Sequence, residues 1–183
     1  MKTAKSDIEN VISRYTLPAR LLHWVLALLL ISMVGLGWYM MSIEDTPGSD
    51  WYFNLHKSIG FVVLLLVLAR GLWRLSHPPH PLPATIAHWQ IRVSAISHWA
   101  LYLLMLALPL LGAIGMLFSK HTLIFFGLLE PRLVAPDHDI SELFFSLHSI
   151  AAWLLVILVG VHVLAALKHL LFDKDGVFER MWF

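Results

Sequence analysis

Cysteine is absent from the 183-residue chain. Disulfide bonds, iron–sulfur clusters and covalently attached c-type haem are therefore excluded, because each requires a cysteine thiol. Any metal centre must be held by imidazole, carboxylate or thioether groups. Charge is also scarce, since only 14% of the residues are charged and 58% are hydrophobic, whereas a soluble domain has about 25% charged residues. We therefore expect an integral membrane protein that is embedded in the lipid bilayer.

Carboxylates are missing from the interiors of the long apolar stretches, and no basic tract suggests a nucleic-acid partner. About 20 apolar residues cross the hydrocarbon core of a bilayer, and four stretches reach that length. The expected fold class is an all-α, transmembrane four-helix bundle that forms a single membrane domain over residues 1–183. We expect the spans at about residues 19–41, 53–75, 94–118 and 143–172, with a short interfacial helix at 84–93.

The positions of lysine and arginine predict the orientation. Ten of the thirteen basic residues lie in the N-terminal segment up to Arg20, from Arg70 to Arg92, or from Lys168 to Arg180, and the opposite side has only Lys57, Lys120 and Arg132. Because cytoplasmic loops carry the excess of Lys and Arg, both termini are expected in the cytoplasm, with the protein in the plasma membrane. The first apolar run is too long for a signal-peptide core and is expected to be retained.

Histidines provide the strongest chemical signal. His148 and His162 lie fourteen residues apart in the fourth span, which brings them to within about 40° of one helix face and separates them by roughly 21 Å along the axis. His23 enters the membrane near the cytoplasmic face, and His56 begins a span at the outer face. Because their depths in the membrane match, we expect His23 to pair with His162 and His56 to pair with His148. Two such pairs suit six-coordinate haem irons, although any one of these histidines alone could be an interfacial residue or a helix–helix hydrogen bond.

Several sequence runs carry a family resemblance. They are Arg20-Leu21-Leu22-His23-Trp24, Ala107-Leu108-Pro109-Leu110-Leu111-Gly112, and Leu147-His148 followed by Val161-His162 and Ala165-Ala166-Leu167-Lys168-His169. From about Tyr15 to Trp182 the chain resembles bacterial cytochrome b561, and it is more distantly similar to the cytochrome b subunits of nickel–iron hydrogenases and formate dehydrogenases.

The resemblance implies two b haems, held by the pairs above, and electron transfer between an outer-side donor and a membrane quinone. One branch of that family oxidises superoxide and reduces ubiquinone, so the chain is a candidate superoxide:quinone oxidoreductase. His98 and His169 resemble positions linked to quinone binding and proton supply. Arg20 and Arg70 are candidates to contact haem propionates or a quinone oxygen, or else to snorkel to the interface.

Two rival functions remain open from the sequence. The chain could be the cytochrome b anchor of a larger dehydrogenase, or a transporter that uses histidines to carry a divalent metal. The absence of carboxylates within the spans disfavours the transporter. Acidic loops on the outer side would repel superoxide, whereas Lys57, Lys120 and Arg132 would attract it. The stretch His77 to Thr85 has no lysine, unlike the superoxide-oxidising branch, which leaves the detailed quinone site open.

Overall fold

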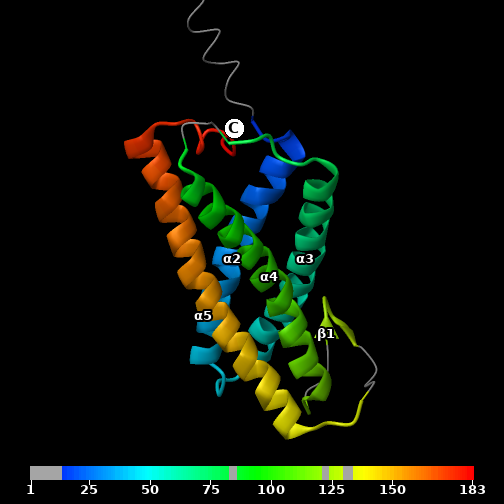
Figure 1. Cartoon of the computed structure of the whole chain (residues 1–183). Coiled ribbons are helices and arrows are strands. Elements are labelled where there is room, and N and C mark those ends of the chain that lie inside the picture. Colours follow the sequence, from blue (N-terminus) through cyan, green and yellow to red (C-terminus); the bar gives the residue numbers. More distant parts are fainter. Residues whose placement is uncertain (1–13, 83–85, 121–123, 130–133) are drawn as a thin grey trace, which may run out of the picture.

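The computed structural model describes residues 14–82, 86–120, 124–129 and 134–183 (Figure 1). Its long helices are α2 (Leu17–Ser42), α3 (Ser49–Ser76), α4 (His88–Phe118) and α5 (His138–Lys168), and the five-residue π-helix η1 (His169–Asp173) continues α5. Strands β1 (Ile124–Phe125) and β2 (Leu128–Leu129) form a short antiparallel hairpin. Each of the four helical segments is long and apolar enough to cross a membrane. The chain is thus an all-α, four-helix membrane protein, as expected.

The helices begin and end close to the expected spans. Helix α2 starts with Pro18 in its first turn, where the missing N–H of proline costs no helical hydrogen bond. Helix α5 is capped at its N-terminus by Asp137, whose carboxylate accepts a hydrogen bond from the N–H of Ile140. The separate interfacial helix expected at 84–93 is wrong for the described residues, because residues 88–93 continue directly into α4.

Figure 1 shows the two ends of the bundle clearly. One end, called here the termini end, holds the start of α2, the C-terminal residues and the connection from α3 to α4. The other end, called the hairpin end, holds the connection from α2 to α3, the β1–β2 hairpin and the start of α5. Residues 1–13, expected to lie in water, are outside the described residues.

Packing divides the bundle into two helix pairs. Helices α2 and α3 bury Leu26, Val63 and Val67 between them, and α4 and α5 bury a second apolar cluster that includes Leu108 and Leu155. Many other large apolar side chains are exposed along the helices, as expected for surfaces that face lipid rather than water. The expectation that residues 1–183 form one domain stays a prediction.

Candidate functional site

Two histidine pairs lie inside the bundle, one toward each end. At the termini end, the ring centres of His23 (α2) and His162 (α5) are 6.3 Å apart. At the hairpin end, the ring centres of His56 (α3) and His148 (α5) are 6.2 Å apart. The interplanar angles, 70° and 72°, are also nearly equal. The structure therefore brings together the same two pairs that the sequence predicted from depth.

This separation is chemically informative. A metal–imidazole bond is about 2 Å long, and each ring centre lies about 1 Å beyond its nitrogen, so two rings on opposite sides of one metal ion have centres roughly 6 Å apart. Imidazoles in direct hydrogen bond or stacking contact would lie closer together. Both pairs therefore have the spacing of two axial ligands on a single ion.

His148 is held in one tautomer. Its Nδ1 lies 2.8 Å from the carbonyl oxygen of Leu108 on α4. A carbonyl can only accept a hydrogen bond, so Nδ1 carries the proton and Nε2 keeps its lone pair free for a metal. Gly112, one turn further along α4, makes the approach possible, because a β-carbon there would lie 3.2 Å from Nδ1 of His148.

His56 is packed less specifically. Its Nδ1 is buried and has no hydrogen-bond partner among the described residues. A buried polar nitrogen without a partner is costly, and a bound group at the site would give it one. Gly37 of α2 faces the same ring, since a β-carbon there would lie 3.5 Å from Cε1 of His56.

A third imidazole lies beside the pair at the termini end. The ring of His98 (α4) is centred 5.7 Å from that of His162, closer than the two pairs above, and Oγ of Ser94 lies 3.5 Å from its Nδ1. The sequence predicted a separate role for His98 and gave no sign of this contact with His162. The separations of 6.3 Å and 5.7 Å do not by themselves distinguish His23 from His98 as the partner of His162.

The C-terminal residues close the termini end next to His23. The indole N–H of Trp24 donates to the carbonyl of Met181 at 3.0 Å, and Arg20 donates to the carbonyl of Trp182 at 2.9 Å. Arg180 is only 5% exposed and donates to the backbone carbonyls of the α3–α4 connection. The residues after Asp173 are therefore folded against α2.

Arg70 lies on a small cleft at the termini end. Arg70, Arg74, Trp73 and Tyr102 are among the residues that line this cleft. The guanidinium carbons of Arg70 and Arg74 lie 5.9 Å and 5.8 Å from the ring centre of Tyr102. Arg70 also donates to the carbonyl of Ala19 at 3.0 Å. Of the four residues predicted near a quinone, only Arg70 lines this cleft.

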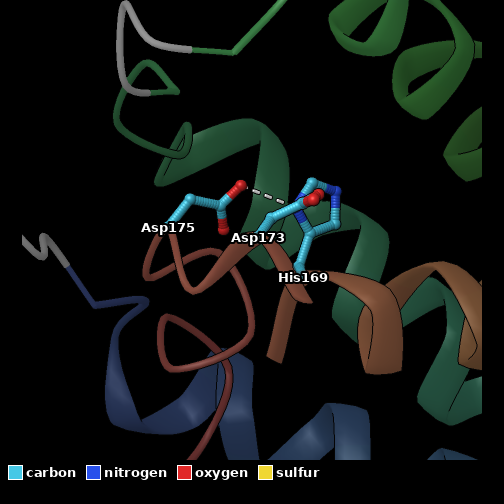
Figure 2. Close-up of side chains that lie close together, drawn as sticks. All are labelled: His169, Asp173 and Asp175. Carbon is cyan, nitrogen blue, oxygen red and sulfur yellow. Dashed lines mark hydrogen bonds and ion pairs between the residues drawn. The ribbon is translucent and has the colours of Figure 1, made fainter. Parts of the chain in front are cut away.

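His169 lies in an acidic cluster where α5 passes into η1 (Figure 2). Its Nδ1 is 2.7 Å from Oδ2 of Asp175 and 3.3 Å from Oδ2 of Asp173. The ammonium group of Lys168 also pairs with Asp173. A histidine and two carboxylates are a common set of metal ligands, but Lys168 already pairs with one of the carboxylates here.

Comparison with known proteins agrees with these features. The family model described as prokaryotic cytochrome b561 matches residues 14–183. "Cytochrome b561 homolog 2" of Escherichia coli K12 is 33% identical over 94% of this chain and 93% of its own length. "Probable superoxide oxidase CybB" of Yersinia pestis is 29% identical over 87% of this chain and 90% of its own length. The chain belongs to the prokaryotic cytochrome b561 family.

Proposed function

We propose that the protein is a di-haem b-type cytochrome that carries electrons between a donor at the hairpin end and a quinone at the termini end. The family implies b-type haem and electron transport in the membrane. The observation that carries the finer proposal is the presence of two histidine pairs with ring separations of 6.3 Å and 6.2 Å. The excess of lysine and arginine at the termini end favours the cytoplasmic side for that end.

His23 and His162 would hold one haem, and His56 and His148 the other. Each haem would supply a one-electron carrier when bound. The protein contributes the ligands, their orientation and a dry environment: Leu108 fixes the tautomer of His148, and the C-terminal residues cover the site beside His23. Both imidazoles of each pair would be used to hold its haem, so we assign neither of them to binding a substrate.

Haem counting in histidine variants tests this assignment. The purified wild-type protein should contain two b haems per chain by the pyridine haemochromogen method. His148→Ala should contain one, because the buried His56 cannot hold the group alone. His138→Ala is a matched control, since His138 is on the same helix, with a side chain that is 79% exposed, and should keep both haems. Two haems in His148→Ala would refute the assignment, and none in the wild type would favour the metal transporter.

Superoxide is the donor we propose for the hairpin end. Support comes from the relative named "Probable superoxide oxidase CybB". The hairpin end carries charges of both signs, and its acidic residues outnumber the basic residues Lys57, Lys120 and Arg132. If these cations guide superoxide, its rate of oxidation should fall as salt rises; a rate that increases with salt would mean that the acidic field dominates. A haem reduced by neither superoxide nor quinol would favour the dehydrogenase-anchor function.

Quinone would bind at the cleft lined by Arg70 and Tyr102. Tyr102 lies one helical turn after His98, so both side chains face the same way from α4. Arg70 can donate to a quinone oxygen with the guanidinium N–H groups that do not contact Ala19. Arg20 is held by Trp182 and Phe183, so we assign it to closing the termini end rather than to quinone.

His169 and its two aspartates would supply protons for quinone reduction. The carboxylates accept the Nδ1 proton of His169, which leaves Nε2 to exchange a second proton. Asp175→Asn should slow quinone reduction several-fold while leaving both haems bound and reducible by dithionite, because it removes a proton acceptor without touching the haem ligands. An unchanged rate in both Asp175→Asn and His169→Gln would remove the cluster from the mechanism.

A further inference from the structure

The β1–β2 hairpin is apolar throughout. Residues 123–129 read Leu-Ile-Phe-Phe-Gly-Leu-Leu, between Thr122 and Glu130. Phe125 pairs with Leu128, so Phe126 and Gly127 form a two-residue turn. Both have positive φ, 45° and 83°, which is typical of the tightest hairpins. Such turns in water usually carry Asn-Gly or Asp-Gly, and an aromatic residue with positive φ is unfavourable.

A single side chain of α3 holds this turn. The N–H of Phe126 donates to Oγ of Ser58 at 3.0 Å, and the Ser58 hydroxyl donates to the carbonyl of Asn54 at 2.8 Å. Ser58 is 3% exposed. This contact satisfies the turn N–H without water and fixes the hairpin against α3, two residues beyond His56.

Ser58 lies well inside the helix that crosses the membrane. It is nine residues after the start of α3, or about 13 Å along the axis. Tyr39, Trp51 and Tyr52 form an aromatic cluster at this end. The ring centre of Tyr52 is 5.0 Å from that of Tyr39 and 4.9 Å from that of Trp51. Trp and Tyr gather at the level of lipid headgroups, and Ser58 is roughly 9 Å deeper than Tyr52. Figure 1 shows the hairpin beside α3 and α4, within the length of the bundle.

Phe126 and Leu128 are 66% and 73% exposed at this depth, so other described residues do not cover them. We propose that the hairpin re-enters the bilayer from the hairpin end, and that Phe126 and Leu128 contact lipid acyl chains. Non-helical backbone is tolerated at membrane depth where it packs against protein, and here β1 packs against α3. The β1–β2 pairing and the Ser58 hydroxyl provide partners at the turn.

The lack of native cysteine allows a direct test. Single-cysteine variants Phe126→Cys and Leu128→Cys are reconstituted in liposomes and treated with a charged maleimide, which reacts with thiolates in water. Glu44→Cys, in the loop at the same end, is the aqueous control, and Leu65→Cys, half exposed on α3, is the lipid control. Both hairpin variants should react at least about ten-fold more slowly than Glu44→Cys. All four should react fully after denaturation in detergent.

A hairpin cysteine that reacts as fast as Glu44→Cys would overturn the proposal. Slow reaction could also come from protein cover, so photoreactive benzoylphenylalanine at position 126 provides a second measurement. A phospholipid adduct, identified by intact mass, supports insertion in lipid; adducts with the protein's own chain alone would refute it.

The role of Ser58 is tested in the Phe126→Cys protein. Adding Ser58→Ala should raise the labelling rate several-fold, because the turn loses its hydrogen-bond partner, whereas Ser58→Thr keeps the hydroxyl and should keep the slow rate. An unchanged rate with Ser58→Ala would mean that Ser58 does not hold the hairpin in the membrane. The haem spectrum of each variant reports whether the bundle is intact.

Discussion

Gly112 controls how closely His148 can approach α4, and replacing it should change one redox centre. In Gly112→Ala the new β-carbon would lie 3.2 Å from Nδ1 and 3.4 Å from Cε1 of His148. The imidazole must then retreat by a few tenths of an ångström. Its hydrogen bond to Leu108, now 2.8 Å, would lengthen by a similar amount and lose much of the roughly 1 kcal/mol that such a bond contributes.

The lost hydrogen bond has a predicted sign. Donation from Nδ1 makes an imidazole a stronger electron donor to its metal and favours the oxidised ion. Weakening the bond should therefore raise the midpoint potential of the haem at the hairpin end. Since 59 mV corresponds to about 1.4 kcal/mol for one electron, a loss of about 0.5–1 kcal/mol that fell on the oxidised state alone would raise the potential by about 20–40 mV, which is the largest expected shift.

An optical redox titration of the purified protein measures this effect. One of the two haem components should shift upward, and the other should stay in place. Gly35→Ala is the matched control, because a β-carbon at Gly35 meets nothing within 4 Å, and it should shift neither component. Two unchanged potentials in Gly112→Ala, or equal shifts in both variants, would refute the proposed role of the Leu108 contact.

Four further variants test other contacts. His98→Ala should retain both haems, whereas His23→Ala should lose one; pyridine haemochromogen counts decide which imidazole partners His162. Gly115→Ala should destabilise the α4–α5 contact by about 1–3 kcal/mol, because the new β-carbon would lie 2.8 Å from the Phe145 ring. A lower thermal midpoint than that of Gly35→Ala would confirm this prediction, and an equal midpoint would contradict it. Arg180→Ala removes hydrogen bonds to two backbone carbonyls and should cost about 1–3 kcal/mol, measured by thermal unfolding; no loss would show that the C-terminal cover is held by Trp182 instead.

Hydropathy was enough to predict the fold, because lipid selects for continuous apolar helices. It could not predict the helix ends, since helices extend past the apolar region into polar residues. Thus α3 begins at Ser49 and α4 at His88, several residues before the expected spans. Hydropathy also gave no sign of the hairpin, because its apolar stretch is too short to span a membrane.

The histidine pairs were predictable because an α-helix converts sequence spacing into depth and direction. The contact between His169 and Asp175 in the acidic cluster was not predictable. In a continuous α-helix, Asp175 would lie about 240° around the axis from His169, far from its imidazole. The structure brings it back because η1 widens the last turn and Lys174 adopts a left-handed conformation, with φ of 50°. Such a change in winding has no periodic signal in the sequence.

Helix α5 has a special position in this arrangement, because it alone contributes to both histidine pairs. His23 and His56 come from α2 and α3, so a change in either helix affects one pair. The separation of the two centres along the membrane is instead set by the fourteen residues between His148 and His162, about 21 Å of α-helix. A rigid helix therefore serves as the spacer between the centres. The extensive packing of α5 on α4, including the buried hydrogen bond from Ser141 to Gly115, would keep that distance constant while α2 and α3 adjust.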